Sequence, residues 1–180
     1  MALIDSTYLT GELYIANTAS GPVADTLGTF IEKYSRELLN KVLGIEMRQS
    51  FLSGLEAASP EQRWLDLRDG LGFATNGGDL EWVGFANSQL KASPIANYVF
   101  FKYNIYLIDQ SVGAGNLHPT VENGYIASPI KKLTRAWNEM VLMLRSLVYL
   151  LEAEKELYPE WYGRCNMDMD IVNTVNYMGL

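Results

Sequence analysis

The side chains best suited to acid, base or nucleophilic chemistry are scarce in this chain. It has one histidine, His118, and one cysteine, Cys165, and no motif around either residue supplies a catalytic partner. General-base catalysis and nucleophilic attack both need a second group within hydrogen-bond reach of the reacting one. We therefore interpret His118 as an ordinary loop residue and Cys165 as a bystander thiol. The sequence predicts no catalytic residue and no cofactor, and so a protein that is not an enzyme.

Two short patterns resemble chemical motifs and have a simpler explanation. Ser128 and Lys131 have the Ser-x-x-Lys spacing of some acyl-transfer enzymes, but the companion motifs of those enzymes are absent. Because Pro129 follows Ser128 directly, the pair is typical of a helix start, where serine caps amides and proline lacks an N–H. Asp168 and Asp170 offer two carboxylates without the further oxygens, glycine and closing glutamate of a calcium loop. We expect no metal site.

Composition limits the class of protein. The chain has 180 residues, 48% of them hydrophobic, which is enough apolar mass for the core of one domain. With 14 basic and 21 acidic residues the net charge is -7, and no cluster of lysine and arginine could neutralise phosphates. A primary role in binding nucleic acid is therefore disfavoured. The start lacks a basic, signal-like segment and no apolar run could span a membrane, so we expect a cytoplasmic protein or one carried in a particle assembled there.

Two helices are predicted in the first third of the chain. Apolar residues recur at three- and four-residue spacing over 25–43 and again over 45–56. Asp25 suits the N-cap of the first helix, and Gly44 stands where a left-handed residue commonly ends a helix. Because the link between the segments is so short, we expect an antiparallel helical hairpin.

Ser-Pro pairs open two further predicted helices, over 94–109 and 129–155. The second of these keeps one apolar stripe for about six turns. The first carries aromatic residues all round, so we expect it to be largely buried, in the fold or against another subunit. These aromatic residues are Tyr98, Phe100, Phe101, Tyr103 and Tyr106.

Glycines interrupt the segment between the two pairs of predicted helices. The insertion 64–85 predicts a β-hairpin around 71–85, with residues 76–79 at its tip because Asn, Gly and Asp accept a positive φ. It lacks the Gly-Lys-Ser/Thr of a phosphate-binding loop, so turn chemistry explains its glycines. Segment 111–127 is expected to be a long loop, a class that is mostly functional or disordered.

Together these elements predict a mainly α fold, a multi-helix bundle with a small β-hairpin insertion and an extended C-terminal arm. We expect an N-terminal segment over 1–24, a helical domain over 25–156 and the arm over 157–180. The predicted core contains Phe30, Leu38, Phe51, Trp137, Val141 and Leu144.

The arm is too apolar for an idle solvated tail. It follows a long predicted helix, begins with the breaker Pro159 and carries apolar residues at no sustained helical period. Exposed in a monomer they would form an aggregation-prone patch, so we expect them to dock on a neighbouring subunit or partner. In the alternative interpretation the arm folds back and completes the core of its own domain. The candidate docking residues are Trp161, Tyr162, Met167, Met169, Tyr177 and Met178.

Several segments in combination resemble a known family. The order begins with the predicted helical hairpin that ends at Gly44. The segments after it are Trp64-Leu65-Asp66-Leu67 with Gly70, Trp82-Val83-Gly84-Phe85, Ser93-Pro94-Ile95-Ala96 with Tyr98-Val99-Phe100, Ser128-Pro129, and Ala136-Trp137-Asn138-Glu139-Met140. Over residues 25–151 this order resembles the small helical head-to-tail connector or adaptor (head completion) proteins of tailed phages, notably phages of Bacteroidetes. The insertion at 64–85 is larger than a minimal helical connector needs.

The resemblance implies a structural virion protein at the head-to-tail junction, assembled in the host cytoplasm. Such a protein forms a homo-oligomeric ring, of about twelve copies, between the portal protein and a tail or further ring protein. It extends the channel through which DNA passes without specific binding, and an acidic subunit suits that channel because carboxylates repel phosphates. Two alternatives remain: a small soluble phage or bacterial enzyme with scattered catalytic residues, and a protein that binds a host factor through its aromatic surface.

Overall fold

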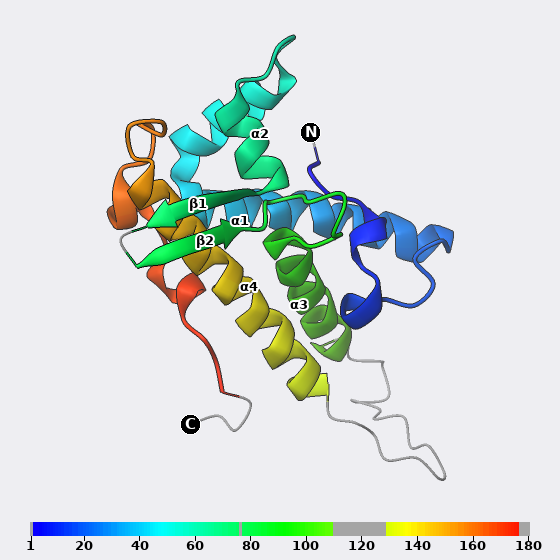
Figure 1. Cartoon of the computed structure of the whole chain (residues 1–180). Coiled ribbons are helices and arrows are strands. Elements are labelled where there is room, and N and C mark those ends of the chain that lie inside the picture. The colour runs from blue at the N-terminus through cyan, green and yellow to red at the C-terminus, as the bar shows by residue number, and fades with distance from the viewer. Residues whose placement is uncertain (1, 76, 110–128, 177–180) are drawn as a thin grey trace, which may run out of the picture.

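The computed structural model describes residues 2–75, 77–109 and 129–176 of the chain. It is mainly helical, with one small antiparallel sheet, which confirms the predicted fold class at that level (Figure 1). The predicted loop 111–127 lies outside the described residues. The helices and strands are α1 Gly21–Glu56, α2 Gln62–Asp69, β1 Leu71–Thr75, β2 Gly78–Trp82, α3 Pro94–Asp109 and α4 Pro129–Ala153, with short 3-10 helices η1 Ser6–Tyr8, η2 Gly11–Leu13, η3 Gly163–Asn166 and η4 Met169–Val172.

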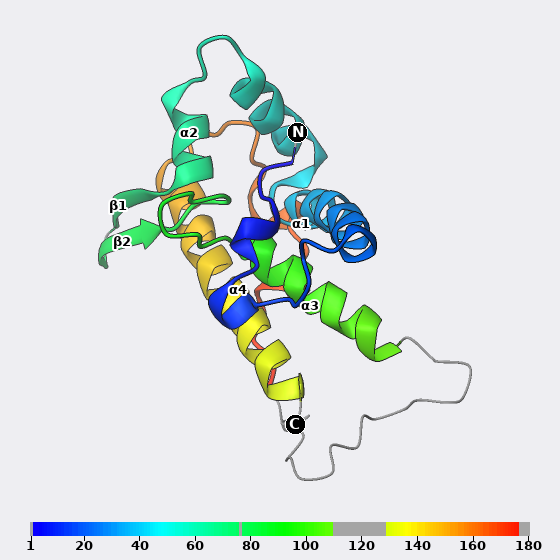
Figure 2. The same cartoon turned by 90° about the vertical axis from the view of Figure 1, so that its right-hand side faces the viewer.

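One long helix, α1, covers the two helices predicted in the first third of the chain. It has a sharp kink at Gly44, between the two predicted segments. Gly44 has φ 79° and ψ 170°, outside the helical region, and the chain changes direction there. The second half turns away from the first and does not fold back along it, so the predicted antiparallel hairpin is wrong (Figures 1 and 2). The predicted cap Asp25 is also wrong. The helix begins at Gly21 after the N-cap position Ser20, because Pro22 is already suited to the first turn.

Helix α3 packs against both α1 and α4 (Figure 1). Ser93 caps it as its sequence suggests: Ser93 Oγ accepts hydrogen bonds from the amides of Ile95 and Ala96 at 3.1 and 3.2 Å. The aromatic residues of α3 are buried only in part. Tyr98, Phe100 and Tyr103 are in the core, whereas the last turns turn outward and leave Tyr106 40% exposed.

The predicted core is mostly correct. The side chains of Leu38, Phe51, Val141 and Leu144 are fully buried. Phe30 is only partly buried. Trp137 was also expected in the core but is only partly buried, because its indole N–H donates to the Asn173 carbonyl at the edge of the fold, at 2.8 Å.

Strands β1 and β2 pair in register from Leu71 opposite Trp82 to Thr75 opposite Gly78. The resulting hairpin lies against α4 (Figure 1). It ends at Trp82, short of the predicted limit at 85, because the chain after Trp82 turns back toward α2, where the amide of Phe85 donates to the Leu67 carbonyl at 3.0 Å.

Both ends of the described chain pack on the helices. Near the N-terminus, Ile4 and Leu9 are buried in the core. The C-terminal arm returns across α1, where the amide of Asp168 donates to the Lys41 carbonyl at 2.8 Å. The arm buries Tyr158, Trp161, Met167 and Ile171. Up to Val172 the arm therefore has the arrangement of the alternative interpretation, in which it completes its own core.

Candidate functional site

The structure describes only part of the set of residues singled out for chemistry. His118 and Ser128 lie outside the described residues, and Cys165 falls in the short helix η3. Lys131 is exposed in the first turn of α4. Lys131 is therefore the one of these four residues whose side chain the structure describes.

Asp168 serves a structural ion pair. Its Oδ2 lies 2.5 Å from Lys41 Nζ, and this bond joins the arm to α1. The bond with Lys41 lowers the pKa of Asp168, and the same bond raises the pKa of Lys41. Asp170 is exposed. Within residues 2–75, 77–109 and 129–176, no group of three or more His, Cys, Asp or Glu side chains could hold a metal ion.

A cluster between α1 and α3 looks more like an active site than any of these. The Tyr98 hydroxyl donates to Glu37 Oε1 at 2.6 Å, and Lys102 Nζ lies 3.7 Å from the same carboxylate. Burial, followed by the bond to Glu37, raises the pKa of Tyr98 well above its usual value. A tyrosine used as a base or nucleophile needs the opposite shift. Because Tyr98 is also only 2% exposed, the cluster is best explained as a core hydrogen bond.

Two of the segments that carry the family resemblance, 64–70 and 82–85, meet at one structural junction. Glycine is required at Gly84, where φ is +95° and a Cβ would lie 2.5 Å from the Arg68 carbonyl oxygen. Gly70 is similar, with φ +106° and the Trp82 carbonyl oxygen 2.7 Å from a Cβ position. The Trp82 indole N–H donates to the Leu67 carbonyl at 3.0 Å. These residues hold the end of α2 against the chain that follows the hairpin.

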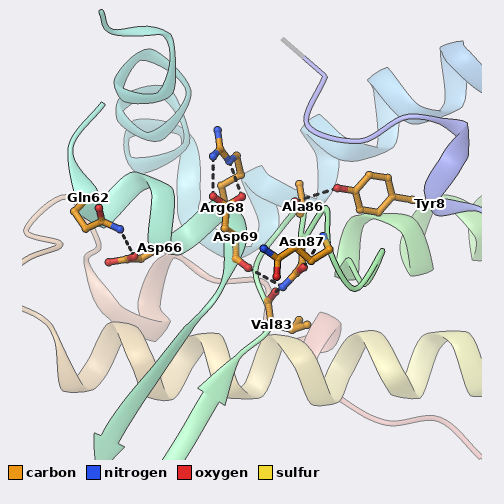
Figure 3. A network of polar contacts seen from close by, with 9 residues as sticks. Tyr8, Gln62, Asp66, Arg68, Asp69, Val83, Ala86 and Asn87 are labelled. Atoms are coloured by element: carbon orange, nitrogen blue, oxygen red, sulfur yellow. Dashed lines mark hydrogen bonds and ion pairs between the residues drawn. The ribbon is translucent and has the colours of Figure 1, made fainter. Parts of the chain in front are cut away.

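Asn87 completes this junction (Figure 3). Its Nδ2 donates to the carbonyls of Asp69 and Val83, at 2.8 and 3.1 Å. Tyr8, from the N-terminal segment, donates its hydroxyl to the Ala86 carbonyl at 3.0 Å. These bonds use main-chain carbonyls as acceptors, so the junction fixes the fold.

The candidate docking residues of the arm are divided by the structure. Trp161 and Met167 are buried in the chain's own core, so neither offers its side chain to a partner in this conformation. Tyr162 is 61% exposed, and a hydrogen bond to Glu46 raises its pKa. Met169 is 45% exposed. Tyr177 and Met178 lie outside the described residues.

An open depression of about 590 Å³ lies at the kink of α1. Lys41, Glu46, Glu160 and Tyr162 are among its lining residues. Two of these charges are paired: Lys41 with Asp168, and Glu160 with Arg63 at 3.0 Å. Glu46 is hydrogen-bonded to the neutral Tyr162 hydroxyl, which leaves its negative charge in place.

A more informative surface was missed in the sequence. Leu142 and Tyr149 are 60% and 50% exposed on the outer side of α4, away from its buried stripe. Tyr149 shares one hollow with Leu80 of the hairpin and another with Met169 of the arm. We call these four residues the apolar face. The seven-residue spacing of Leu142 and Tyr149 was the available signal, because two helical turns return a side chain to the same side.

Comparisons with known proteins give no relatives. The chain matches no family model, no curated protein and no solved structure. In the part of the chain that the structure describes, every helix is too short or too polar to cross a membrane.

Proposed function

We propose that the protein is a structural adaptor of a tailed-phage particle, which forms a ring between the portal and the tail and extends the DNA channel. The observation that carries the proposal is the apolar face of Leu80, Leu142, Tyr149 and Met169. Gathered apolar side chains on the surface of a soluble protein mark a place where another protein binds.

The apolar face is not a by-product of a poor core. Helices α1, α3 and α4 already bury an extensive set of apolar side chains, including Leu38, Val141 and Leu144 at 0% exposure. Leu142 stays 60% exposed next to them. Since burial of apolar area contributes roughly 25 cal/mol per Å², covering this face with a neighbouring subunit would favour assembly.

The residues of the apolar face belong to different elements, which suits the face to a contact that is repeated between subunits. Leu80 is on the hairpin, Tyr149 on α4 and Met169 on the arm, so a partner there would touch three elements that the fold holds together. A ring needs such a surface on each copy and a second, different surface that receives it, because a head-to-tail contact repeated around an axis closes on itself.

The net charge of -7 supports the same role. A subunit that surrounds moving DNA must not bind it tightly, and carboxylates repel phosphates at close range. A protein whose task was to grip DNA would carry clustered basic side chains instead.

The test is assembly with the portal protein encoded in the same genome. Purified chain, alone and mixed with portal rings, is examined by light scattering after size exclusion and by electron microscopy. We expect ring-shaped particles and a complex with the portal. Leu142→Glu and Tyr149→Glu should each prevent assembly while the helical circular dichroism stays unchanged.

Leu90→Glu is the matched control, because Leu90 is 64% exposed but belongs to the loop before α3. This variant should assemble like the wild-type chain. Failure of the wild-type chain to form a ring and to bind the portal would overturn the proposal. Equal loss of assembly in the Leu90 variant would remove the apolar face as its basis.

A further inference from the structure

A small hollow lies between α4 and the arm, which runs beside this helix (Figure 1). Helix α4 contributes Val148 and Tyr149 to its lining, and the arm contributes Met167, Met169 and Val172. The volume of the hollow is about 190 Å³. Sites for whole small molecules usually measure about 300–1,000 Å³, so this hollow has room for one or two side chains rather than for a metabolite.

The hollow is already formed in the folded chain. Val148 and Met167 are each 6% exposed and belong to the core, whereas Tyr149 and Met169 are 50% and 45% exposed. Buried apolar side chains thus have more exposed apolar side chains beside them. Binding to such a surface costs little rearrangement, because its groups are held in place before a partner arrives.

Two arginines line the same hollow, Arg145 and Arg164. Arg164 Nε and Nη2 donate to Glu152 at 2.8 and 3.2 Å, so the charge of Arg164 is paired. Arg145 Nε donates to the Val172 carbonyl at 3.1 Å, which leaves its two terminal nitrogens without a partner in the part of the chain that the structure describes. Among the described lining residues there is no aspartate or glutamate, so the positive charge of Arg145 is uncompensated there.

We propose that the hollow binds an acidic and apolar segment of a partner protein. An aspartate or glutamate carboxylate of that segment pairs with the terminal nitrogens of Arg145, and a neighbouring apolar side chain fills the hollow. A guanidinium and a carboxylate match because they form two parallel hydrogen bonds. Removal of the apolar side chain from water adds a second favourable contribution. Arginine and tyrosine are also residue types on which binding energy tends to concentrate.

Nucleic acid fits the hollow less well than such a segment. A backbone phosphate could pair with Arg145, but it brings no apolar group for the methionines and the valines of the lining. The net charge of -7 also repels an extended polyanion at longer range. A single carboxylate within an apolar segment meets little of that repulsion.

Tyr149 and Met169 also belong to the apolar face, so in the particle this inference rests on the proposed function. It names the chemistry of the protein surface that covers this part of the face. The hollow is complete within one chain, and its binding can therefore be measured without assembly.

The experiment titrates short peptides into the full-length chain, labelled with carbon-13 at its methionine methyl groups and separated as the monomer by size exclusion. Met167 and Met169 report on the hollow. Met47 and Met140, which are 0% exposed and lie outside its lining, report on the fold. The probe is acetyl-Leu-Glu-Leu-amide. Acetyl-Leu-Gln-Leu-amide has the same shape without the charge, and acetyl-Leu-Leu with a free terminal carboxylate carries its charge at a chain end.

We expect the Glu peptide to shift the NMR signals of Met167 and Met169 and to bind about five- to tenfold more tightly than the Gln peptide. Arg145→Gln should remove this preference and leave the affinity for the Gln peptide unchanged. The losses from the two changes should not add, because both remove the same contact. Arg145→Lys should keep part of the preference, since it keeps the charge without the paired nitrogens.

Arg36→Gln is the matched control, because Arg36 is an exposed arginine of α1 that does not line the hollow. This variant should bind both peptides like the wild-type chain. Three results would overturn the proposal: no shift with the Glu peptide, equal affinity for the Glu and Gln peptides, or the same preference in wild type and Arg145→Gln. Binding of the peptide with the free terminal carboxylate alone would also overturn it, because the hollow would then select chain ends.

The outcome for the hollow is separate from the outcome for the adaptor function. A chain that binds the Glu peptide but forms no ring and no portal complex has the binding site without the proposed function. A chain that assembles with the portal but does not bind the Glu peptide has the proposed function, and the inference about the hollow is then wrong.

Discussion

Replacement of Gly84 by alanine tests the junction that joins α2 to the chain after the hairpin. Two separate penalties arise at this residue. Its φ of +95° is unfavourable for any residue with a Cβ, which costs about 1–3 kcal/mol. The new methyl group would also lie 2.5 Å from the Arg68 carbonyl oxygen and 2.6 Å from the Asp69 carbonyl carbon.

The backbone around Gly84 has little freedom to retreat. The amides of Phe85 and Ala86 donate to the carbonyls of Leu67 and Arg68, at 3.0 and 2.8 Å, and hold the two segments together. Forcing extra volume into such a contact costs about 1–3 kcal/mol. We therefore expect Gly84→Ala to lower the free energy of unfolding by about 2–6 kcal/mol, the sum of both penalties.

Gly78→Ala is the matched control, because φ is +121° there but nothing lies within 4 Å of a Cβ. It should lose only the backbone penalty, about 1–3 kcal/mol. Gly72→Ala, with open space and no positive φ, should lose nothing. Urea unfolding followed by circular dichroism measures all three. If Gly84→Ala and Gly78→Ala agree within about 0.5 kcal/mol, the close approach at the junction is refuted.

Three further predictions concern the arm. Lys41→Met should lower the free energy of unfolding at pH 7 by about 0.5–1 kcal/mol. Because the bond to Lys41 lowers the pKa of Asp168, this difference from the wild-type chain should be lost as the pH falls below 3.8. Equal losses at pH 7 and below pH 3.8 in urea unfolding would contradict the ion pair of Lys41 and Asp168. Burial raises the pKa of Tyr158 to about 12 from 10.0, so the wild-type chain should lose stability as the pH rises from 10 to about 12, and Tyr158→Phe should lose less over that range in the same assay. Truncation after Glu156 removes the buried Tyr158, Trp161, Met167 and Ile171; at about 1.5–3 kcal/mol each, this approaches the whole stability of a domain, so a cooperative thermal transition in the truncated chain would refute the assignment of the arm to the core.

Local signals in the sequence predicted α3, α4 and the hairpin, but they missed helix α2, which occupies the first part of the predicted insertion 64–85. Ser93 and Pro94 predicted the start of α3, and in the structure the first amides of the helix donate hydrogen bonds to Ser93 Oγ as expected. Gly44 was recognised as the end of a helical segment because a positive φ suits glycine. These features depend on residues close in sequence, which is why the sequence alone could predict them.

The direction of the chain after Gly44 depends on distant residues. A left-handed break stops the helix but does not set where the next segment goes. Phe51 is fully buried and lies 6.0 Å from the ring of Trp64, measured between ring centroids, and this packing fixes the second half of α1. Since Trp64 lies on α2, no pattern within α1 could show that the segment turns away instead of folding back.

The contacts between α4 and the end of the arm were also beyond sequence analysis. Trp137 was expected in the core because it falls on the apolar stripe of α4, yet its N–H turns to the Asn173 carbonyl. Asn138 is an ordinary helix-surface residue by type, and its two bonds to Val175 join residues 37 positions apart. A segment that is bound through its main chain needs no particular side chains, so its sequence shows no pattern from which the contact could be predicted.

The two attachments of the arm explain why its composition was compatible with two opposite interpretations. Up to Ile171 the arm is held by burial of side chains, which only a matching cavity in the chain's own core provides. From Asn173 onward it is held by hydrogen bonds to its backbone from Trp137 and Asn138, and its side chains stay exposed. Because such bonds contribute less to folding than the burial of apolar side chains does, the stability that the arm provides depends mainly on its first part.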